Sequence, residues 1–210
     1  PWCGYFGLML QVDLFIFLDS VQFSRRSWQQ RNQIKGTSGP QWLTVPVLSK
    51  GKRDQIISTV EIDASSNFFD NHRKNIINAY SKCPYFEDTA KKLFSFDFSN
   101  FRYLSELNVK LIAVLSKLLK IQTKVLLSSS LPNMGSKAEL LANLCEQVDA
   151  THYISPPGSK EYMEQSNAFE RRAIEVSTYI FDHPVYPQPN GEFLPFMSAI
   201  DLIFNCGPES

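Results

Sequence analysis

Two periods of apolar spacing alternate along the chain and divide it into short strands and amphipathic helices. Residues 14–18 form a continuous apolar run of strand length, which is typical of a strand covered on both faces. Residues 100–120 instead carry leucines three or four positions apart, which places one apolar stripe along a helix. The leucines of this stripe are Leu104, Leu107, Leu111, Leu115 and Leu118.

The same periods predict further elements over the rest of the chain. Strands are predicted at 13–18, 42–47, 59–62, 123–127, 151–155 and 174–181. Helices are predicted at 5–12, 67–82, 100–120, 136–148, 159–169 and 195–204. Ser136 and Glu139 have the spacing of a capping box, and Pro195 suits the first turn of the last helix. Pro46 lacks the N–H that a central strand needs, so its strand is predicted to lie at an edge or a bulge.

The order of these elements indicates an α/β protein. Strands and helices alternate from about residue 100 onward, which favours an open, mostly parallel sheet with helices on both faces. We expect one domain over residues 1–210. Ligands of such folds bind beyond the carboxyl ends of the strands. The segments that follow predicted strands there are 19–32, 128–137, 155–160 and 182–188.

Composition and charge exclude several classes of protein. Lys and Arg (21) balance Asp and Glu (21), so no overall charge favours nucleic acid or a membrane surface as a partner. No apolar run approaches the ~20 residues of a membrane helix, and no signal peptide is visible. The four cysteines lack the close spacing of a zinc site, which indicates reduced thiols in a cytoplasmic protein, with disulfide pairing as the alternative. Because the chain opens inside an aromatic, glycine-containing run, we also expect that an N-terminal strand is missing from it.

The cations of the chain are unevenly placed. Residues 20–53 contain seven cationic side chains and no Asp or Glu, in a chain of zero net charge. These cations are Arg25, Arg26, Arg31, Lys35, Lys50, Lys52 and Arg53. Since planar guanidinium groups bind carboxylate or phosphate through paired hydrogen bonds, this segment is a candidate site for an anionic small molecule. The alternative is a solvated basic loop that pairs with acids elsewhere in the chain.

Within this segment the run from Gln22 to Asn32 is the strongest candidate. Arg26 and Arg31 lie five positions apart with Trp28 between them, so both guanidinium groups can reach one phosphate while the indole stacks on a base or sugar. The alternative is that Trp28 anchors the loop to the core and that Arg31 pairs with Asp19.

Asp19 and His183 are candidates for catalysis. Asp19 closes a predicted strand, where a carboxylate suits Mg²⁺ or orients an arginine, or forms a structural salt bridge with Arg26 or Arg31. His183 follows another predicted strand, with Tyr186 and Gln188 close behind, and its imidazole is suited to acid–base chemistry near neutral pH. The alternative for His183 is a turn held by hydrogen bonds to the backbone.

Two further groups lie at predicted helices. Ser136 and Lys137 open a predicted helix whose free N–H groups suit a phosphate, although no P-loop pattern is present. The alternative for Ser136 is a simple N-cap. Asp201 shares one face of the last helix with Ser198 and Asn205, which suits either a catalytic role or buried hydrogen bonds that hold the helix.

Several runs of the chain closely resemble the bacterial WbqC-like family. They are GYF at 4–6, FLDSVQF at 17–23, RSWQQRN at 26–32, QWLTVPV at 41–47, GSK at 135–137, YIS at 153–155, HPVYPQ at 183–188 and SAIDLIFNCG at 198–207. The resemblance covers essentially the whole chain in order. Trp2 and Cys3 depart from the tyrosine and hydrophobic residue usual in the family at these places.

The resemblance implies a role in surface glycans, because members of this family are often encoded among genes for O-antigen and other surface polysaccharides. A looser resemblance to nucleotidyltransferase-like (Rossmann-like) α/β proteins implies ATP, with Mg²⁺, as a candidate cofactor. We therefore expect a cytoplasmic transferase or ligase that binds a nucleotide or a nucleotide-linked amino sugar, with acyl or aminoacyl transfer to the sugar amine as the reaction. The alternative is a non-catalytic scaffold of a polysaccharide-assembly complex, and the many aromatic residues are compatible with a homodimer.

Overall fold

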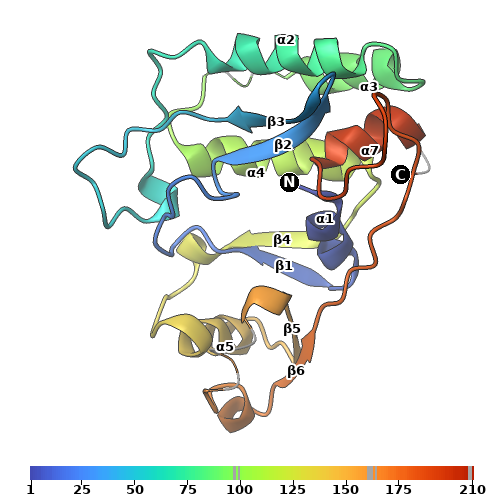
Figure 1. Ribbon diagram of the computed structural model, residues 1–210. Helices are drawn as coiled ribbons and strands as arrows, with labels where there is room; N and C mark the ends of the chain where they lie inside the picture. Colours follow the sequence, from blue (N-terminus) through green and yellow to red (C-terminus); the bar gives the residue numbers. More distant parts are fainter. Residues whose placement is uncertain (97, 99, 160–162, 164, 208–209) are drawn as a thin grey trace. The chain divides into compact units, whose positions relative to one another are not determined.

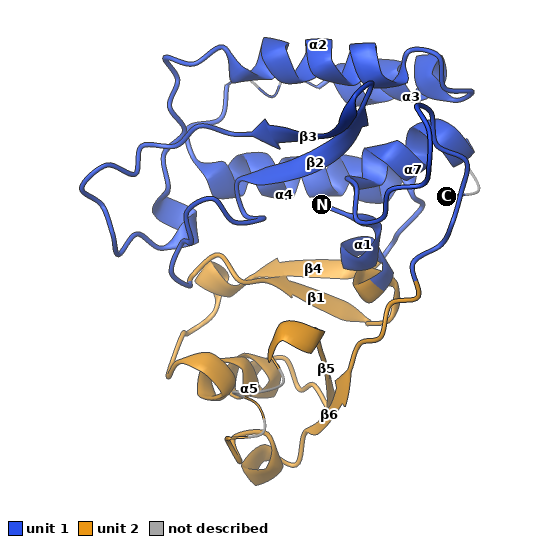
Figure 2. Ribbon diagram, in the orientation of Figure 1, with its two compact units in different colours: residues 1–7, 21–122, 183–210 blue, residues 8–20, 123–182 orange. Residues whose placement is uncertain are grey.

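A computed structural model describes residues 1–96, 98, 100–159, 163, 165–207 and 210 (Figure 1). The chain divides into two compact units, and both are discontinuous in sequence (Figure 2). Unit 1 consists of residues 1–7, 21–122 and 183–210. Unit 2 consists of residues 8–20 and 123–182. The prediction of one domain over 1–210 stays a prediction, and each unit is described by itself below.

Unit 1 is built on an antiparallel hairpin. Strand β2 (Arg31–Gly36) pairs with β3 (Gly39–Thr44) across the two-residue turn 37–38, and helix α2 (Phe68–Tyr80) packs against β2. The other helices are α3 (Phe86–Phe94), α4 (Leu104–Leu118), α7 (Ala199–Cys206) and the first residues of α1 (Cys3–Leu10). Figure 1 shows the hairpin drawn between α2 and α4. Its core contains Ile34, Tyr80, Leu104 and Phe204, all with exposed fractions of 0 %.

Unit 2 contains two parallel strand pairs. Strand β1 (Leu14–Phe17) pairs with β4 (Lys124–Leu127), and β5 (His152–Ser155) pairs with β6 (Glu175–Thr178). Helix α5 (Lys137–Gln147) lies between β4 and β5 in the sequence. The apolar face of α5 packs on a small core that includes Leu141, Ala168 and Phe169.

The α/β class is confirmed, and so are the parallel pairs of unit 2. The described strands form three separate pairs, and the pair of unit 1 is an antiparallel hairpin whose first strand, β2, was not predicted. The nucleotidyltransferase-like arrangement stays a prediction. Helices α1, α2, α4, α5 and α7 and strands β1, β3, β4, β5 and β6 were predicted close to their observed positions.

Several local predictions were wrong. Ser136 makes no side-chain cap bond, and Glu139 of the predicted capping box accepts hydrogen bonds from two arginines. The last helix begins at Ala199 rather than Pro195, and Phe196 has a left-handed φ of 63°, which does not continue a right-handed helix. Residues 59–62 form a 3₁₀ turn and isolated bridges in place of a strand. The sequence analysis missed α3, and the helix predicted at 159–169 falls partly outside the described residues.

Candidate functional site

The candidate site of unit 1 is the segment 22–32, which we call the basic loop. Two glutamine side chains fold this loop: Gln29 Oε1 accepts a hydrogen bond from the backbone N–H of Ser24 (2.9 Å), and Gln30 Oε1 accepts one from that of Arg26 (3.0 Å). Asn108 of α4 donates to the carbonyl oxygen of Gln29 (2.8 Å). The loop is therefore fastened to itself and to α4 by side-chain amides.

The hairpin register brings an arginine and a tryptophan onto one face. Arg31 lies opposite Thr44, and Gln33 lies opposite Trp42, so Arg31 and Trp42 are diagonal neighbours on the same face of the ribbon. The guanidinium carbon of Arg31 lies 4.1 Å from the centre of the Trp42 ring. The ring of Trp28 lies 5.3 Å from that of Trp42, tilted by 47°. We call Trp28, Arg31 and Trp42 the platform.

The platform is open to solvent and its charge is not neutralised. Trp28 is 61 % exposed and Trp42 is 41 % exposed. Within the described part of the chain, neither Arg26 nor Arg31 forms an ion pair with a carboxylate, and Arg31 Nε is buried without a hydrogen-bond partner. Arg26 also has a φ of 56°, a conformation that L-residues adopt only at a cost and that clusters at ligand sites. An anion at this surface would meet unpaired guanidinium groups.

Other cations of the segment are used internally. Lys35 is only 1 % exposed, and its ammonium group donates to the carbonyl oxygens of Gly191 and Glu192. Arg25 donates to the carbonyl oxygen of Ser49.

Lys52 forms an ion pair with Glu61 (3.2 Å), which Arg102 also binds (2.8 Å). The solvated-loop alternative thus holds for Lys52. It does not describe Arg26 and Arg31, which lack such a partner among the described residues.

Two remaining side chains of the basic loop have local roles. Gln22 Nε2 donates to the carbonyl oxygen of Arg53 (3.2 Å), which ties the start of the loop to residues 53–55. Asn32 Oδ1 accepts a hydrogen bond from the backbone N–H of Gln33 (2.7 Å). Both predicted ligand contacts, Gln22 and Asn32, therefore also hold the backbone that carries the platform.

Asp201 lies at the centre of a buried polar network. Its side chain is fully buried, Oδ2 accepts a hydrogen bond from the hydroxyl of Tyr80 (2.7 Å), and Oδ1 accepts one from the amide of Gln188 (2.8 Å). The Tyr80 hydroxyl in turn accepts from the backbone N–H of Lys35 (2.9 Å). Gln188 further exchanges two hydrogen bonds with the backbone of Leu194. The network joins α2, β2, α7 and the segment 186–194.

Burial controls the protonation equilibria of this network. Desolvation raises the pKa of Asp201, and the hydrogen bonds from Tyr80 and Gln188 together with the charge of Lys35 act in the opposite direction. Desolvation also raises the pKa values of Tyr80 and Tyr186 well above the ordinary tyrosine value, with the nearby Asp201 charge adding to it. The same causes raise the pKa of Cys3 to about 11. The hydroxyls of Tyr80 and Tyr186 and the thiol of Cys3 therefore stay protonated over the neutral range.

His183 lies among aromatic rings, and both of its nitrogens have partners. Nε2 accepts a hydrogen bond from the backbone N–H of Phe196 (3.0 Å), and Nδ1 lies 2.9 Å from the carbonyl oxygen of Pro184, which assigns the proton to Nδ1. Trp2 and Tyr186 stack on the imidazole, and Phe193 and Phe196 contact it edge-on. This environment matches the turn-holding alternative for His183.

In unit 2 the serines after β4 surround Asp19, which is 5 % exposed. Oδ1 accepts hydrogen bonds from the hydroxyl of Ser128 (3.1 Å) and the backbone N–H of Ser129 (2.9 Å), and Oδ2 accepts one from the hydroxyl of Ser129 (2.6 Å). Ser20 continues the cluster by bonding to Ser128 and Asn133 (both 2.7 Å). The cluster lies at the carboxyl ends of the parallel strands β1 and β4, as the sequence predicted for Asp19.

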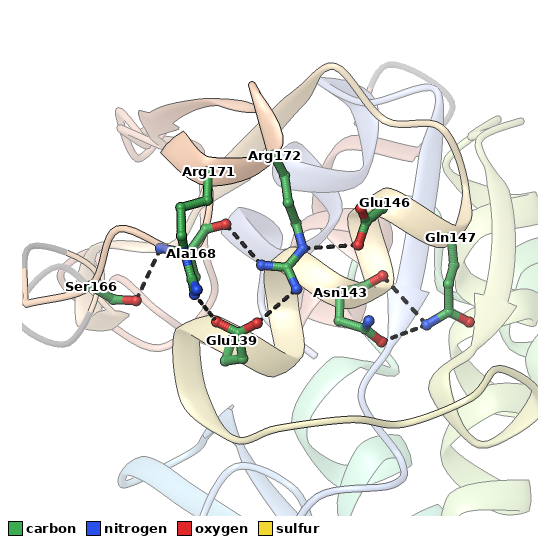
Figure 3. A network of polar contacts seen from close by, with 8 residues as sticks. All are labelled: Glu139, Asn143, Glu146, Gln147, Ser166, Ala168, Arg171 and Arg172. Atoms are coloured by element: carbon green, nitrogen blue, oxygen red, sulfur yellow. Dashed lines mark hydrogen bonds and ion pairs between the residues drawn. The ribbon is translucent and has the colours of Figure 1, made fainter.

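Ion pairs order another part of unit 2 (Figure 3). Arg172 donates to Glu139 (2.7 Å) and to Glu146 (2.9 Å), and Arg171 donates to Glu139 (2.6 Å). These contacts hold the turn 170–172 against α5 and lower the pKa of Glu139. Lys137 starts α5 with a φ of 50°, and its neighbour Ser136 contributes its carbonyl to the first turn.

The predicted site residues therefore divide between the two units. Unit 1 holds Gln22, Arg26, Trp28, Arg31, Asn32, His183, Tyr186, Gln188 and Asp201, and unit 2 holds Asp19, Ser136 and Lys137. Within unit 1 the predicted site residues fall into two groups. One group lies in the basic loop, and the other consists of Asp201 with its hydrogen-bond partners and His183 with the aromatic rings around it. Across the described residues, no group of three or more His, Cys, Asp or Glu side chains suits a metal ion.

The sequence analysis missed Trp42, Tyr80 and Lys35 as parts of these groups. A signal for Trp42 was present: a Gly-Thr-Ser-Gly turn at 36–39 predicts a hairpin, and its register would have placed Trp42 diagonal to Arg31. Tyr80 and Lys35 gave no such signal, because their partners lie far away in the sequence.

Comparisons with known proteins give one consistent result. The family model described as the WbqC-like protein family matches residues 1–210. The uncharacterized protein Rv1507c of Mycobacterium tuberculosis is 36 % identical over 212 residues, covering 100 % of this chain and 91 % of that protein. No solved structure matches the chain. Among the described residues, no helix has the length and apolar character that crossing a membrane requires.

Proposed function

The chain belongs to the WbqC-like protein family, and from this premise we propose that it binds a phosphate-bearing ligand at the basic loop. The ligand class is a nucleotide or a nucleotide-linked amino sugar. The observation that carries the proposal is the platform, in which the exposed ring of Trp28 and the guanidinium of Arg31 both contact the ring of Trp42. In the described part of the chain no carboxylate pairs with Arg31. A ring face suits a base or sugar, and guanidinium edges suit phosphate.

The proposed role is that of a cytoplasmic transferase or ligase in the synthesis of surface polysaccharide, in keeping with the gene context that the family resemblance implies. The reaction is acyl or aminoacyl transfer to the amine of the sugar. The amine nitrogen bonds to the acyl carbon, the bond from that carbon to its leaving group breaks, and the amine gives up a proton. Arg26 and Arg31 neutralise the phosphate of the ligand in this scheme.

His183 is the proposed acceptor of that proton, and the geometry sets a condition for it. Nε2 accepts the backbone N–H of Phe196, so its lone pair is available only when the Phe196 N–H moves away. Phe196 is 52 % exposed, and its left-handed φ of 63° strains the backbone. A change of conformation at Phe196 would relieve this strain and move its N–H away from Nε2. Asp201 is fully buried and serves to hold Tyr80 and Gln188 rather than to touch a ligand.

Isothermal titration calorimetry tests the site. The chain is titrated with ATP, with and without Mg²⁺, and with a uridine-diphosphate-linked amino sugar. We expect Arg31→Ala and Arg26→Ala each to weaken binding at least about tenfold, since a hydrogen bond to a charged group contributes roughly 1.5–3 kcal/mol. Arg73→Ala is the matched control, because Arg73 also lies over an aromatic ring, that of Phe94, but outside the basic loop. Absence of binding by the unaltered chain, or equal binding by both loop variants, would remove the assignment.

A non-catalytic binding role is the second candidate, and one observation favours it. Asp201 and His183, the catalytic candidates of unit 1, are both engaged in internal hydrogen bonds. If the chain binds the nucleotide sugar but forms no acylated product with ATP and an amino acid, the scaffold role gains. Formation of an amide-linked product that requires His183 would decide for the enzyme.

A further inference from the structure

Trp42 contacts the arginine of the platform from the neighbouring strand. The guanidinium carbon of Arg31 lies 4.1 Å above the centre of the Trp42 ring, a distance that places the two flat groups in face contact. We propose that Trp42 is a positioning residue that holds the Arg31 guanidinium ready for phosphate. The inference rests on the proposed function, because it assigns a supporting residue to the same phosphate site.

Trp42 can hold Arg31 ready for phosphate because stacking on the ring leaves the guanidinium N–H groups open to a ligand. A guanidinium that rests with its face on an indole keeps its N–H groups in its own plane, pointing sideways, where phosphate oxygens can meet two of them at once. Arg31 Nε is buried and has no hydrogen-bond partner, and within the described residues the guanidinium makes no hydrogen bond at all. The Trp42 ring is therefore the described contact that fixes the orientation of the fork.

The two tryptophans of the platform then have different tasks. One face of Trp42 is used by Arg31, and Trp28 contacts the same ring at 5.3 Å. Trp28 is the more exposed of the two, at 61 % against 41 %, and thus offers the ring surface for the ligand. Paired strands hold Trp42 opposite Gln33, whereas Trp28 lies on the loop before β2. Trp42, on the paired strand β3, supports Arg31, and Trp28, on the loop, offers a ring surface to the ligand.

Calorimetry with inorganic tripolyphosphate as the probe tests the assignment on the full chain. Trp42→Phe keeps a ring face, and we expect its affinity to stay within about threefold of the unaltered chain. Trp42→Leu fills the site without a ring and should bind at least about tenfold more weakly, as should Arg31→Lys, which keeps the charge but not the planar fork. The double variant W42L/R31K should be no weaker than R31K alone. Equal binding by W42L and the unaltered chain would overturn the proposal.

A readout that needs no ligand separates this inference from the proposed function. In an NMR spectrum of arginine Nε–H groups, the Arg31 signal should carry a ring-current shift that W42F retains and W42L loses. If the unaltered chain binds neither tripolyphosphate nor ATP nor the nucleotide-linked amino sugar, the proposed function fails, yet this shift still decides whether Trp42 orients Arg31. An Arg31 signal unchanged in W42L overturns the inference even where tripolyphosphate binds.

Two controls guard against a folding effect. Phe94→Leu removes the ring beneath Arg73 and should leave both tripolyphosphate binding and the Arg31 signal unchanged. Trp42→Met, which fills the site with a flexible thioether, replaces W42L if W42L does not fold, and the same tenfold loss is expected of it.

Discussion

Asp201 in unit 1 and Asp19 in unit 2 are both buried aspartates that accept hydrogen bonds on both oxygens, but their partners differ. Tyr80, the partner of Asp201 on α2, has an exposed fraction of 0 %, whereas Ser129, a partner of Asp19, is exposed to solvent. Asp201 is therefore fully buried together with Tyr80, whereas Asp19 is buried next to a serine that is exposed to solvent. A buried carboxylate is a candidate for chemistry only where its partners also reach the surface.

Arg172 of unit 2 and Arg31 of unit 1 also differ in their partners. Arg172 of unit 2 is bound by Glu139 and Glu146, and so it orders a turn against α5 (Figure 3). Arg31 of unit 1 has no such acid within the described residues and rests on Trp42. The first arrangement fixes structure, and the second leaves a charge for a ligand.

The largest effect that sharpens the comparison is expected from Asp201→Ala. The change leaves the Tyr80 hydroxyl and the Gln188 amide without their acceptor in a site that water does not reach. We expect the free energy of unfolding to fall by about 3 kcal/mol, measured by urea denaturation. Asp63→Ala is the control, because the exposed hydrogen bonds that the Asp63 carboxylate accepts come from Ser65, two positions away. A loss below about 1 kcal/mol would show that Asp201 is not the centre of the network.

A smaller effect is expected from Asp19→Ala. It removes three hydrogen bonds, but solvent can reach Ser129 and replace part of them. We expect a loss of about 2 kcal/mol in the free energy of unfolding, together with faster hydrogen exchange at the Ser129 amide. A stability loss equal to that of Asp201→Ala would break the comparison, since solvent access would then have no influence.

The sequence predicted the elements well where one period dominates. The leucines of α4 recur at helical spacing and the apolar run of β1 is unbroken, so the spacing alone indicates each element. Strand β2 was missed because its residues, Arg31–Gly36, are mostly polar, and the pattern gives no alternation to detect. Its strand character comes from pairing with β3 and from a hydrogen bond between the carbonyl of Gln33 and the N–H of Ser198.

The candidate site was predictable only in its exposed part. Arg26, Trp28 and Arg31 are neighbours in the sequence, so their shared surface follows from local spacing. Asp201 meets Tyr80 across 121 positions, a contact that no local pattern encodes. For His183 the alternatives of base and turn were open, and the partner on Nε2, the backbone N–H of Phe196, is set by a strained turn that sequence spacing does not reveal.

The smallest effect is expected in the pH dependence, because hydrogen bonds and Lys35 offset much of the desolvation of Asp201. Burial raises the pKa of Asp201 above its value in the unfolded chain, so between the two values the native state binds more protons than the unfolded state. The free energy of unfolding should therefore fall as the pH rises through this window, and it should stay lowered by the full amount at higher pH. Urea denaturation of the unaltered chain and of Asp201→Asn, from about pH 3.5 to about pH 6, isolates this carboxyl, because the other acids titrate in both. A difference between the two proteins that is constant, or that changes in favour of the unaltered chain as pH rises, would mean that the hydrogen bonds and the charge of Lys35 match or outweigh the desolvation of Asp201, which contradicts the prediction.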